Sequence, residues 1–165
     1  MLVREEADSK NANQKEYLPS KNTDCIFCKQ SVPEKLVIFE DERFIVSHRL
    51  DSQGPSSYLG LVLIQTKRHV NDLGELDEAE ASELGTLIQK VGKALKTVTG
   101  AAWAYCYCFM EGARHVHVFV TSRYPNVPQE YVRLNIGNWP EAPLGELKQV
   151  EELSSQLRSL LSREA

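Results

Sequence analysis

Apolar residues between positions 84 and 98 recur at intervals of three and four, which predicts the buried face of a long helix. The positions on this face are Leu84, Leu87, Ile88, Val91, Leu95 and Val98. Asp77 and Glu80 have the spacing of a capping box, with Asp in place of the usual Ser or Thr. The helix is therefore expected to begin after Asp77 and to stop at Gly100.

A second amphipathic pattern predicts a helix near the C-terminus. Its apolar positions are Leu147, Val150, Leu153, Leu157 and Leu160. A loop punctuated by prolines precedes this helix and separates it from the last predicted strand. These prolines are Pro125, Pro128, Pro140 and Pro143.

Five further segments have the apolar runs or the alternation typical of β-strands. They are residues 36–40, 43–47, 58–65, 102–110 and 114–120. In residues 102–110 both alternating sets are largely apolar, so we expect cover on both faces, by a helix or a partner subunit. The order predicts an α+β fold, with an antiparallel sheet of about five strands, a long helix after the third strand and a C-terminal helix.

Length and composition indicate one globular domain, because the chain has 165 residues with 42% hydrophobic and 25% charged residues. Residues 1–22 are polar and are predicted to be a disordered or loosely docked tail, with a single domain over 23–165. A net charge of −4 with interspersed signs argues against bulk nucleic-acid binding. The longest apolar run, Leu59–Ile64, is too short to span a membrane.

Cysteine usage favours a reducing compartment. Of the four cysteines, two form a Cys-x-x-Cys pair, which is more typical of a metal or redox site than of a secreted disulfide scaffold. The N-terminus has no apolar stretch of the signal-peptide kind. We therefore expect a cytoplasmic protein.

Two histidines share one face of the strand predicted over 114–120. Strand alternation places His115, His117 and Phe119 on this face and valines on the other. A single histidine in a strand is more often a hydrogen-bonded core residue. Two on one face, flanked by β-branched residues, favour a functional role.

The Cys-x-x-Cys pair is a candidate zinc site. Two thiolates can bind one Zn²⁺, but a structural site needs four ligands. Cys106 and Cys108 lie too far apart along their strand to complete it, whereas histidines at strand ends can. The predicted ligands are Cys25, Cys28, His69 and His115. A redox dithiol and simple burial remain the alternatives.

Three segments in this order resemble the histidine triad (HIT) superfamily of nucleotide hydrolases and nucleotidyltransferases, especially its branch with an N-terminal zinc knuckle. They are Cys25–Cys28, Leu61–His69 and His115–Val120. The resemblance spans roughly residues 24–123. It implies a HIT-like fold, a structural Zn²⁺, a homodimer, and a nucleotide or nucleotide conjugate as substrate.

The resemblance also implies roles for individual residues. The middle histidine of the motif, His117, corresponds to a nucleophile that attacks a nucleotide α-phosphate, and water then hydrolyses the nucleotidyl-histidine. His115 corresponds to a zinc ligand. Phe27 is the implied contact of the base and Asp51 that of the ribose hydroxyls.

This chain departs from the family pattern at two places. Phe119 stands where the family has its third histidine, and phenylalanine cannot donate a hydrogen bond to the phosphate or the leaving group. Loss of one such donor costs on the order of 10²–10³ in kcat. The Gly-Gln stretch before the motif is replaced by Glu111–Arg114. Arg114 and Arg123 are candidate phosphate contacts, with a surface role for each as the alternative.

Three hypotheses follow. The first is a zinc-stabilised HIT hydrolase or nucleotidyltransferase that acts through His117. The second is a degenerate HIT domain that binds a nucleotide or a protein partner with little catalysis, and Phe119 is the feature that supports it. A thiol redox protein is the weakest hypothesis, since no thioredoxin-like βαβ pattern surrounds Cys25 and Cys28.

Overall fold

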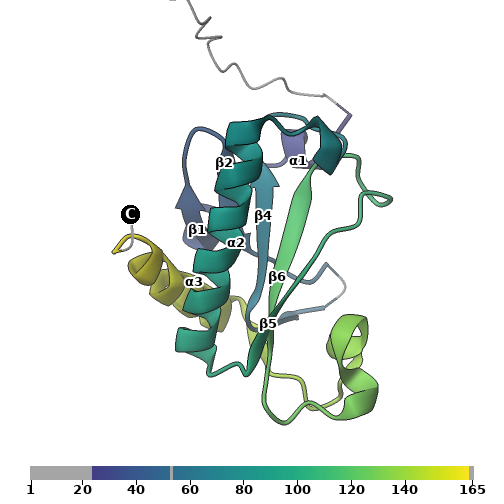
Figure 1. The fold of residues 1–165 in the computed structure, drawn as a ribbon. Helices are drawn as coiled ribbons and strands as arrows, with labels where there is room; N and C mark the ends of the chain where they lie inside the picture. The colour runs from purple at the N-terminus through teal and green to yellow at the C-terminus, as the bar shows by residue number, and fades with distance from the viewer. Residues whose placement is uncertain (1–23, 53, 164–165) are drawn as a thin grey trace, which may run out of the picture.

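The computed structural model describes residues 24–52 and 54–163 as a five-stranded antiparallel sheet with two helices on one side (Figure 1). The strand order is β1-β2-β4-β6-β5. The strands are β1 Val37–Glu40, β2 Phe44–His48, β4 Leu61–Thr66, β5 Trp103–Tyr107 and β6 His117–Arg123. The predicted tail, residues 1–22, lies outside the described residues.

The core lies between the sheet and the two long helices, α2 Glu78–Thr99 and α3 Leu147–Leu161. Alternate residues of the strands point into it, for example Val46, Ile64 and Val118, and meet the apolar faces of both helices. The α+β architecture, with α2 after the third strand of the main sheet and a helix at the C-terminus, confirms the predicted fold class.

Local signals placed α2 correctly at both ends. Asp77 accepts a hydrogen bond from the Glu80 backbone N–H, and Glu80 accepts one from the Asp77 backbone N–H, so the capping box is complete. Gly100 has the left-handed φ of 70° that ends a helix. Glu80 also accepts from Arg68, so the same carboxylate ties the start of α2 to the end of β4.

The predicted strand 58–65 is wrong at its start. Ser56–Tyr58 forms β3, which pairs with β7, Leu144–Glu146, in a separate two-stranded sheet that the sequence did not reveal. The chain then turns at Gly60, whose φ is +88°, before β4 begins at Leu61. A Cβ at Gly60 would lie 2.5 Å from Ser122 Oγ, so the turn needs glycine for both conformation and space.

The last two strands are displaced from their predicted limits. β5 ends at Tyr107 instead of 110, and β6 runs from His117 to Arg123 instead of 114–120. The sheet ladder starts late because Val116 pairs with the loop after β4: its N–H donates to Val70 O and its C=O accepts from Thr66 N–H. β5 is an edge strand on which Trp103 is 57% exposed, so the described residues do not cover both of its faces.

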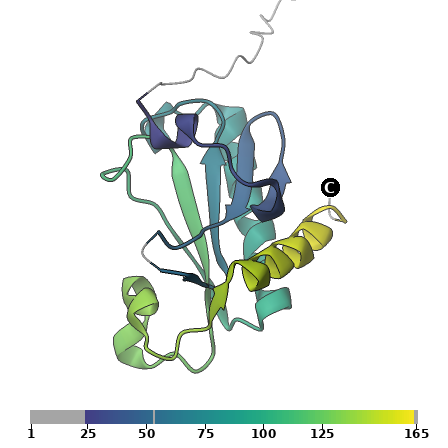
Figure 2. The ribbon, with the colours of Figure 1, turned by 180° about the vertical axis from the view of Figure 1, so that it is seen from behind.

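The face of the sheet away from α2 is only partly covered (Figure 2). Its lower part lies under the segment that follows β6, which includes η3 Gln129–Tyr131 and η4 Arg133–Asn138 and packs on Leu61 and Tyr105. Its upper part lies beneath the short helix α1, Ile26–Lys29. No helix among the described residues combines the length and apolar character needed to cross a bilayer.

Gly60→Ala is expected to lower the free energy of unfolding by more than about 1 kcal/mol, because alanine is strained at this φ and collides with Ser122. Thermal or denaturant unfolding measures the change. Gly85→Ala is the matched control, since Gly85 lies in the exposed middle of α2 and a Cβ there would have nothing within 4 Å. That variant should be neutral or more stable by up to about 1 kcal/mol; equal losses in both variants would contradict the role of Gly60.

His48 predicts an acid-sensitive component of stability. Its Nε2 accepts the Gly60 N–H at 3.1 Å and its Nδ1 donates to Arg49 O at 2.9 Å, so the ring is neutral. Burial lowers the pKa of His48 to about 4 from the usual 6.5. Because the unfolded chain takes up the proton first, this contribution is complete above about pH 6.5 and is lost as the pH falls to about 4.

The expected loss is up to about 3 kcal/mol over that interval, and a His48→Gln variant should lack this component. NMR titration of the imidazole provides the direct check. A midpoint near 6.5 in the folded protein would show that the ring is not held neutral.

Candidate metal centre and active site

Two thiols and two imidazoles from three separate places in the chain meet at the top of the sheet. Cys25 caps the start of α1 and Cys28 lies within it, His69 lies in the loop after β4, and His115 lies just before β6. The ligand atoms of all four residues lie within 4.8 Å of one another. The structure therefore brings together the four residues that the sequence nominated as ligands.

The distances suit a tetrahedral metal. The Sγ–Nδ1 separations are 3.4 Å for Cys25–His115, 3.6 Å for Cys28–His115 and 3.5 Å for Cys28–His69. A tetrahedral site with ordinary Zn–S and Zn–N bond lengths requires about 3.5 Å between a sulfur and a nitrogen. The four side chains thus fit a zinc ion without rearrangement of the backbone.

The second nitrogen of each histidine fixes its tautomer. His115 Nε2 donates to Thr66 O at 2.7 Å, and His69 Nε2 donates to Asn71 Oδ1 at 3.1 Å. In a neutral ring these bonds leave each Nδ1 without a hydrogen, and each Nδ1 faces a thiol, as metal coordination requires. Burial lowers the pKa of His115 below its ordinary value, which also favours the neutral ring.

An ion pair behind the cluster holds the loop that carries His69. Arg68 donates to both carboxylate oxygens of Glu80 and to Glu75 O. Glu80 is fully buried, and its charge is balanced by Arg68 and by the capping bond to Asp77. Removal of one partner of such a pair leaves an uncompensated buried charge, so this contact rigidly positions the loop.

His117 starts β6 on the partly open face of the sheet. Its Nδ1 lies 2.6 Å from the backbone oxygen of His115. Since a carbonyl only accepts, Nδ1 carries the hydrogen and Nε2 of the neutral ring keeps its lone pair. The ring is 6% exposed, because Phe27 packs on one side, with centroids 4.7 Å apart, and Phe119 meets it edge-on at 5.5 Å.

Two cavities lie beside Phe27, and His117 lines neither of them. One of about 200 Å³ extends towards β2 and is lined by His48, Arg49 and Leu50, and one of about 420 Å³ extends towards Lys29 and Lys67. Phe27, Gln30, Ser31 and Gln65 line both. An apolar ring, an amide and nearby cations can bind a planar group together with an anion.

The family of the chain follows from comparison with known proteins. The family model described as HIT domain matches residues 30–126, which is more than half of the chain. The chain belongs to the HIT domain family.

Solved structures support this fold. A Hit-like protein involved in cell-cycle regulation from Bartonella henselae aligns with a TM-score of 0.63 and 19% identity, over 84% of this chain and 97% of that one. A Zn-bound histidine triad family protein from Mycobacterium smegmatis aligns with a TM-score of 0.55 and 17% identity, over 78% of this chain and 84% of that one. The diadenosine triphosphate hydrolase of Plasmodium falciparum aligns with a TM-score of 0.59 and 15% identity, over 90% of this chain and 91% of that one.

The other nominated residues of this HIT domain lie at varied distances from His117. Asp51 is exposed and is not among the residues that line the 200 Å³ cavity, although Arg49 and Leu50 are. Arg123 stands at the opposite end of β6, six residues on, where it stacks 4.5 Å over Trp103.

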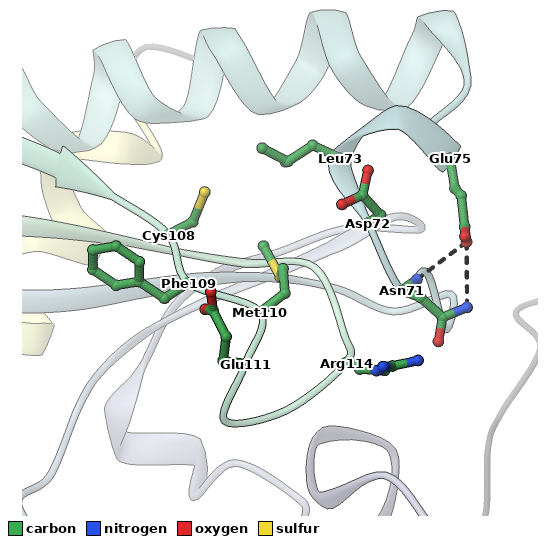
Figure 3. Close-up of a pocket in the computed structure, with 9 residues that line it drawn as sticks. All are labelled: Asn71, Asp72, Leu73, Glu75, Cys108, Phe109, Met110, Glu111 and Arg114. Atoms are coloured by element: carbon green, nitrogen blue, oxygen red, sulfur yellow. Dashed lines mark hydrogen bonds between the residues drawn. The ribbon is translucent and has the colours of Figure 1, made fainter.

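Arg114 lies on the metal side of the HIT domain, at a separate cavity of about 580 Å³ (Figure 3). Residues of η2, Leu73–Glu75, line one side of this cavity and the loop after β5 lines the other. His117 does not line it. The larger space is thus separate from the histidine on which the resemblance centres.

Sequence reasoning missed Gln65 and Tyr107. Gln65 is 5% exposed and pairs with His117 across β4 and β6, and Tyr107 pairs with Phe119 across β5 and β6. Both pairings depend on the register between neighbouring strands, and the sequence of a single strand carries no signal for that register.

Proposed function

We propose that this HIT domain is a nucleotide hydrolase or nucleotidyltransferase that acts at a nucleotide α-phosphate through His117. The observation that carries the proposal is the 2.6 Å contact of His117 Nδ1 with the His115 carbonyl oxygen. In the neutral ring this contact leaves Nε2 with its lone pair, so the imidazole can act as a nucleophile without a separate base. Phe27 and Gln65, which neighbour this ring, line two cavities that supply room for a nucleotide.

The reaction proceeds in two steps. His117 Nε2 forms a bond to the α-phosphorus while the bond from phosphorus to the leaving group breaks, and the leaving group departs with that electron pair and takes a proton from water. Water, or another acceptor in a transferase, then attacks the phosphorus and breaks the Nε2–phosphorus bond. The products are the nucleoside monophosphate and a regenerated His117.

Substrate binding follows from the residues around these cavities. The base packs against Phe27, and the buried amide of Gln65 donates to a phosphate oxygen opposite His117. Asp51 reaches the ribose hydroxyls from the loop after β2. Arg114 lines the separate cavity on the metal side of the domain, so its positive charge acts there and not at the cavities beside Phe27.

The alternative is a domain that binds nucleotides or a protein partner with little catalysis. Phe119 favours it, because it occupies the position two residues after His117 on the same face and offers no hydrogen bond to developing negative charge. The two functions share the binding site and differ only in turnover.

Turnover of an adenosine 5′-phosphoramidate separates these functions. We expect release of adenosine monophosphate, an acid-labile adduct on His117, and at least about a 10³-fold loss of kcat in His117→Ala, which removes the nucleophile. Phe119→His should raise kcat by about 10²–10³, since it restores a donor beside the phosphate.

Circular dichroism and nucleotide affinity provide the controls for these variants. If wild-type protein binds the nucleotide without adduct or turnover, and Phe119→His gains activity, the chain is a degenerate binding domain. If neither protein binds adenosine monophosphate, both versions of the nucleotide proposal fail.

We further propose that Cys25, Cys28, His69 and His115 bind one structural Zn²⁺. When bound, the ion cross-links α1 to the sheet, and thereby holds Phe27 against His117. All four positions are filled by protein ligands, as in structural sites, so no open position is left for substrate.

Elemental analysis should find about one zinc per chain, and Cys25→Ser should reduce it to near zero. Removal of zinc by a chelator should lower the Tm of the wild type by about 10 °C and leave Cys25→Ser unchanged. Cys106→Ser is the matched control, because this exposed thiol lies outside the cluster. A metal-free wild type with reversible dithiol chemistry would instead support the redox hypothesis.

We also propose a cytoplasmic homodimer. β5 is a sheet edge with an exposed Trp103, and α2 lies beside it, so two copies can cover these surfaces together. Light scattering at micromolar concentration measures the mass.

A further inference from the structure

A row of aromatic rings crosses the open face of the sheet, and His117 lies within it. Phe27 and Phe119 flank His117, with centroids 4.7 and 5.5 Å from its own. Phe119 stacks on Tyr107 at 5.3 Å with 24° between the planes, and Tyr107 lies 6.0 Å from Phe109. All these separations are those of contacting aromatic rings.

His117 divides the row into two chemically different sides. Phe27 and Gln65 border the two cavities assigned to the nucleotide, where lysines, serine and amides contribute polar groups. On the other side stand three uncharged rings, those of Phe119, Tyr107 and Phe109. Burial raises the pKa of the Tyr107 phenol, so this ring stays neutral at ordinary pH.

The second side is partly exposed. Phe119 and Tyr107 are half-buried, and Phe109 at the end of the row is 51% exposed. Phe109 also lines the 580 Å³ cavity, which Phe119 and Tyr107 do not line, and Figure 3 shows its ring directed away from Asn71 and Arg114. The wall is therefore accessible along one edge.

We propose that Phe119, Tyr107 and Phe109 form a stacking wall for an aromatic leaving group. The inference rests on the proposed function of His117. While His117 attacks, the phosphorus carries the nucleoside and the leaving group as separate substituents, with the leaving group opposite Nε2. With the nucleoside on the Phe27 side, the surface that remains beside His117 for the leaving group to contact is that of Phe119. The substrate class is a nucleotide joined through its α-phosphate to a group that ends in a flat aromatic ring.

Under this assignment, Phe119 in place of the third motif histidine changes which leaving groups the site prefers. A histidine next to the phosphate would favour a charged or strongly polar leaving group through its hydrogen bond. Phe119, held by its stack on Tyr107, offers dispersion and quadrupole attraction to a flat ring instead. The wall thus selects among substrates by shape and aromaticity.

The test compares adenosine 5′-phosphoramidates of 2-phenylethylamine and 2-cyclohexylethylamine, which differ little in size and in the basicity of the amine. Wild-type protein should favour the phenyl compound by about 3- to 10-fold in kcat/KM. Phe119→Leu should bring this ratio close to one. Tyr107→Phe keeps the ring and should retain the preference, whereas Tyr107→Leu should reduce it.

Two outcomes would contradict the proposed stacking wall. One is a wild-type protein whose kcat/KM is equal for the two compounds or higher for the cyclohexyl compound. The other is a phenyl preference that survives in folded Phe119→Leu and Tyr107→Leu proteins. If turnover is absent, dissociation constants of the same two compounds measured by calorimetry provide the same ratio. Failure to bind adenosine monophosphate at all would instead overturn the proposed function, so the two failures are distinguishable.

Discussion

His115 links the two halves of the candidate site. Its imidazole faces the cysteine thiols through Nδ1, and its backbone carbonyl accepts the Nδ1 hydrogen of His117. Its own Nε2 is held by Thr66 O at the end of β4. One residue thus sets the geometry of the four-ligand cluster and the tautomer of the neighbouring histidine. Any displacement of His115 would disturb both, because the two hydrogen bonds leave it little freedom.

The fold keeps His115 in place by pairing the residues just before β6 with the loop after β4. Val116 exchanges backbone hydrogen bonds with Thr66 and Val70, on either side of His69. Arg68 is in turn held by the buried carboxylate of Glu80 at the first turn of α2. The helix on the covered face therefore stabilises the loop that bears a candidate metal ligand. The packing of α2 in the core thus helps to fix the position of His69 in the candidate site.

Phe119 changes the chemistry of the open face more than its shape. It continues an aromatic row from His117 to Tyr107, where a polar donor would interrupt it. The face is then polar on the Phe27 side, through Gln65 and neighbouring groups, and apolar on the other. Under the proposed function, these two surfaces would lie on either side of the phosphate, with hydrogen bonding concentrated on the nucleotide side.

The sequence by itself determined the elements whose signals are local. The period of α2 and its capping residues fixed both helix ends, and the order of elements indicated the α+β class. Cys25, Cys28, His69 and His115 could be nominated together because metal chemistry limits which side chains combine, and the structure does bring them together.

Only the tertiary structure decided relations that depend on pairing between distant segments. The split of the predicted strand at Gly60 follows from its contact with Ser122 and from β7, both far along the chain. The neighbours of His117 follow from register, which places Gln65 opposite it and stacks Tyr107 on Phe119. A strand's own pattern tells which residues share a face, whereas the residues that lie beside them are set by hydrogen-bonded neighbours whose alignment is fixed only on folding.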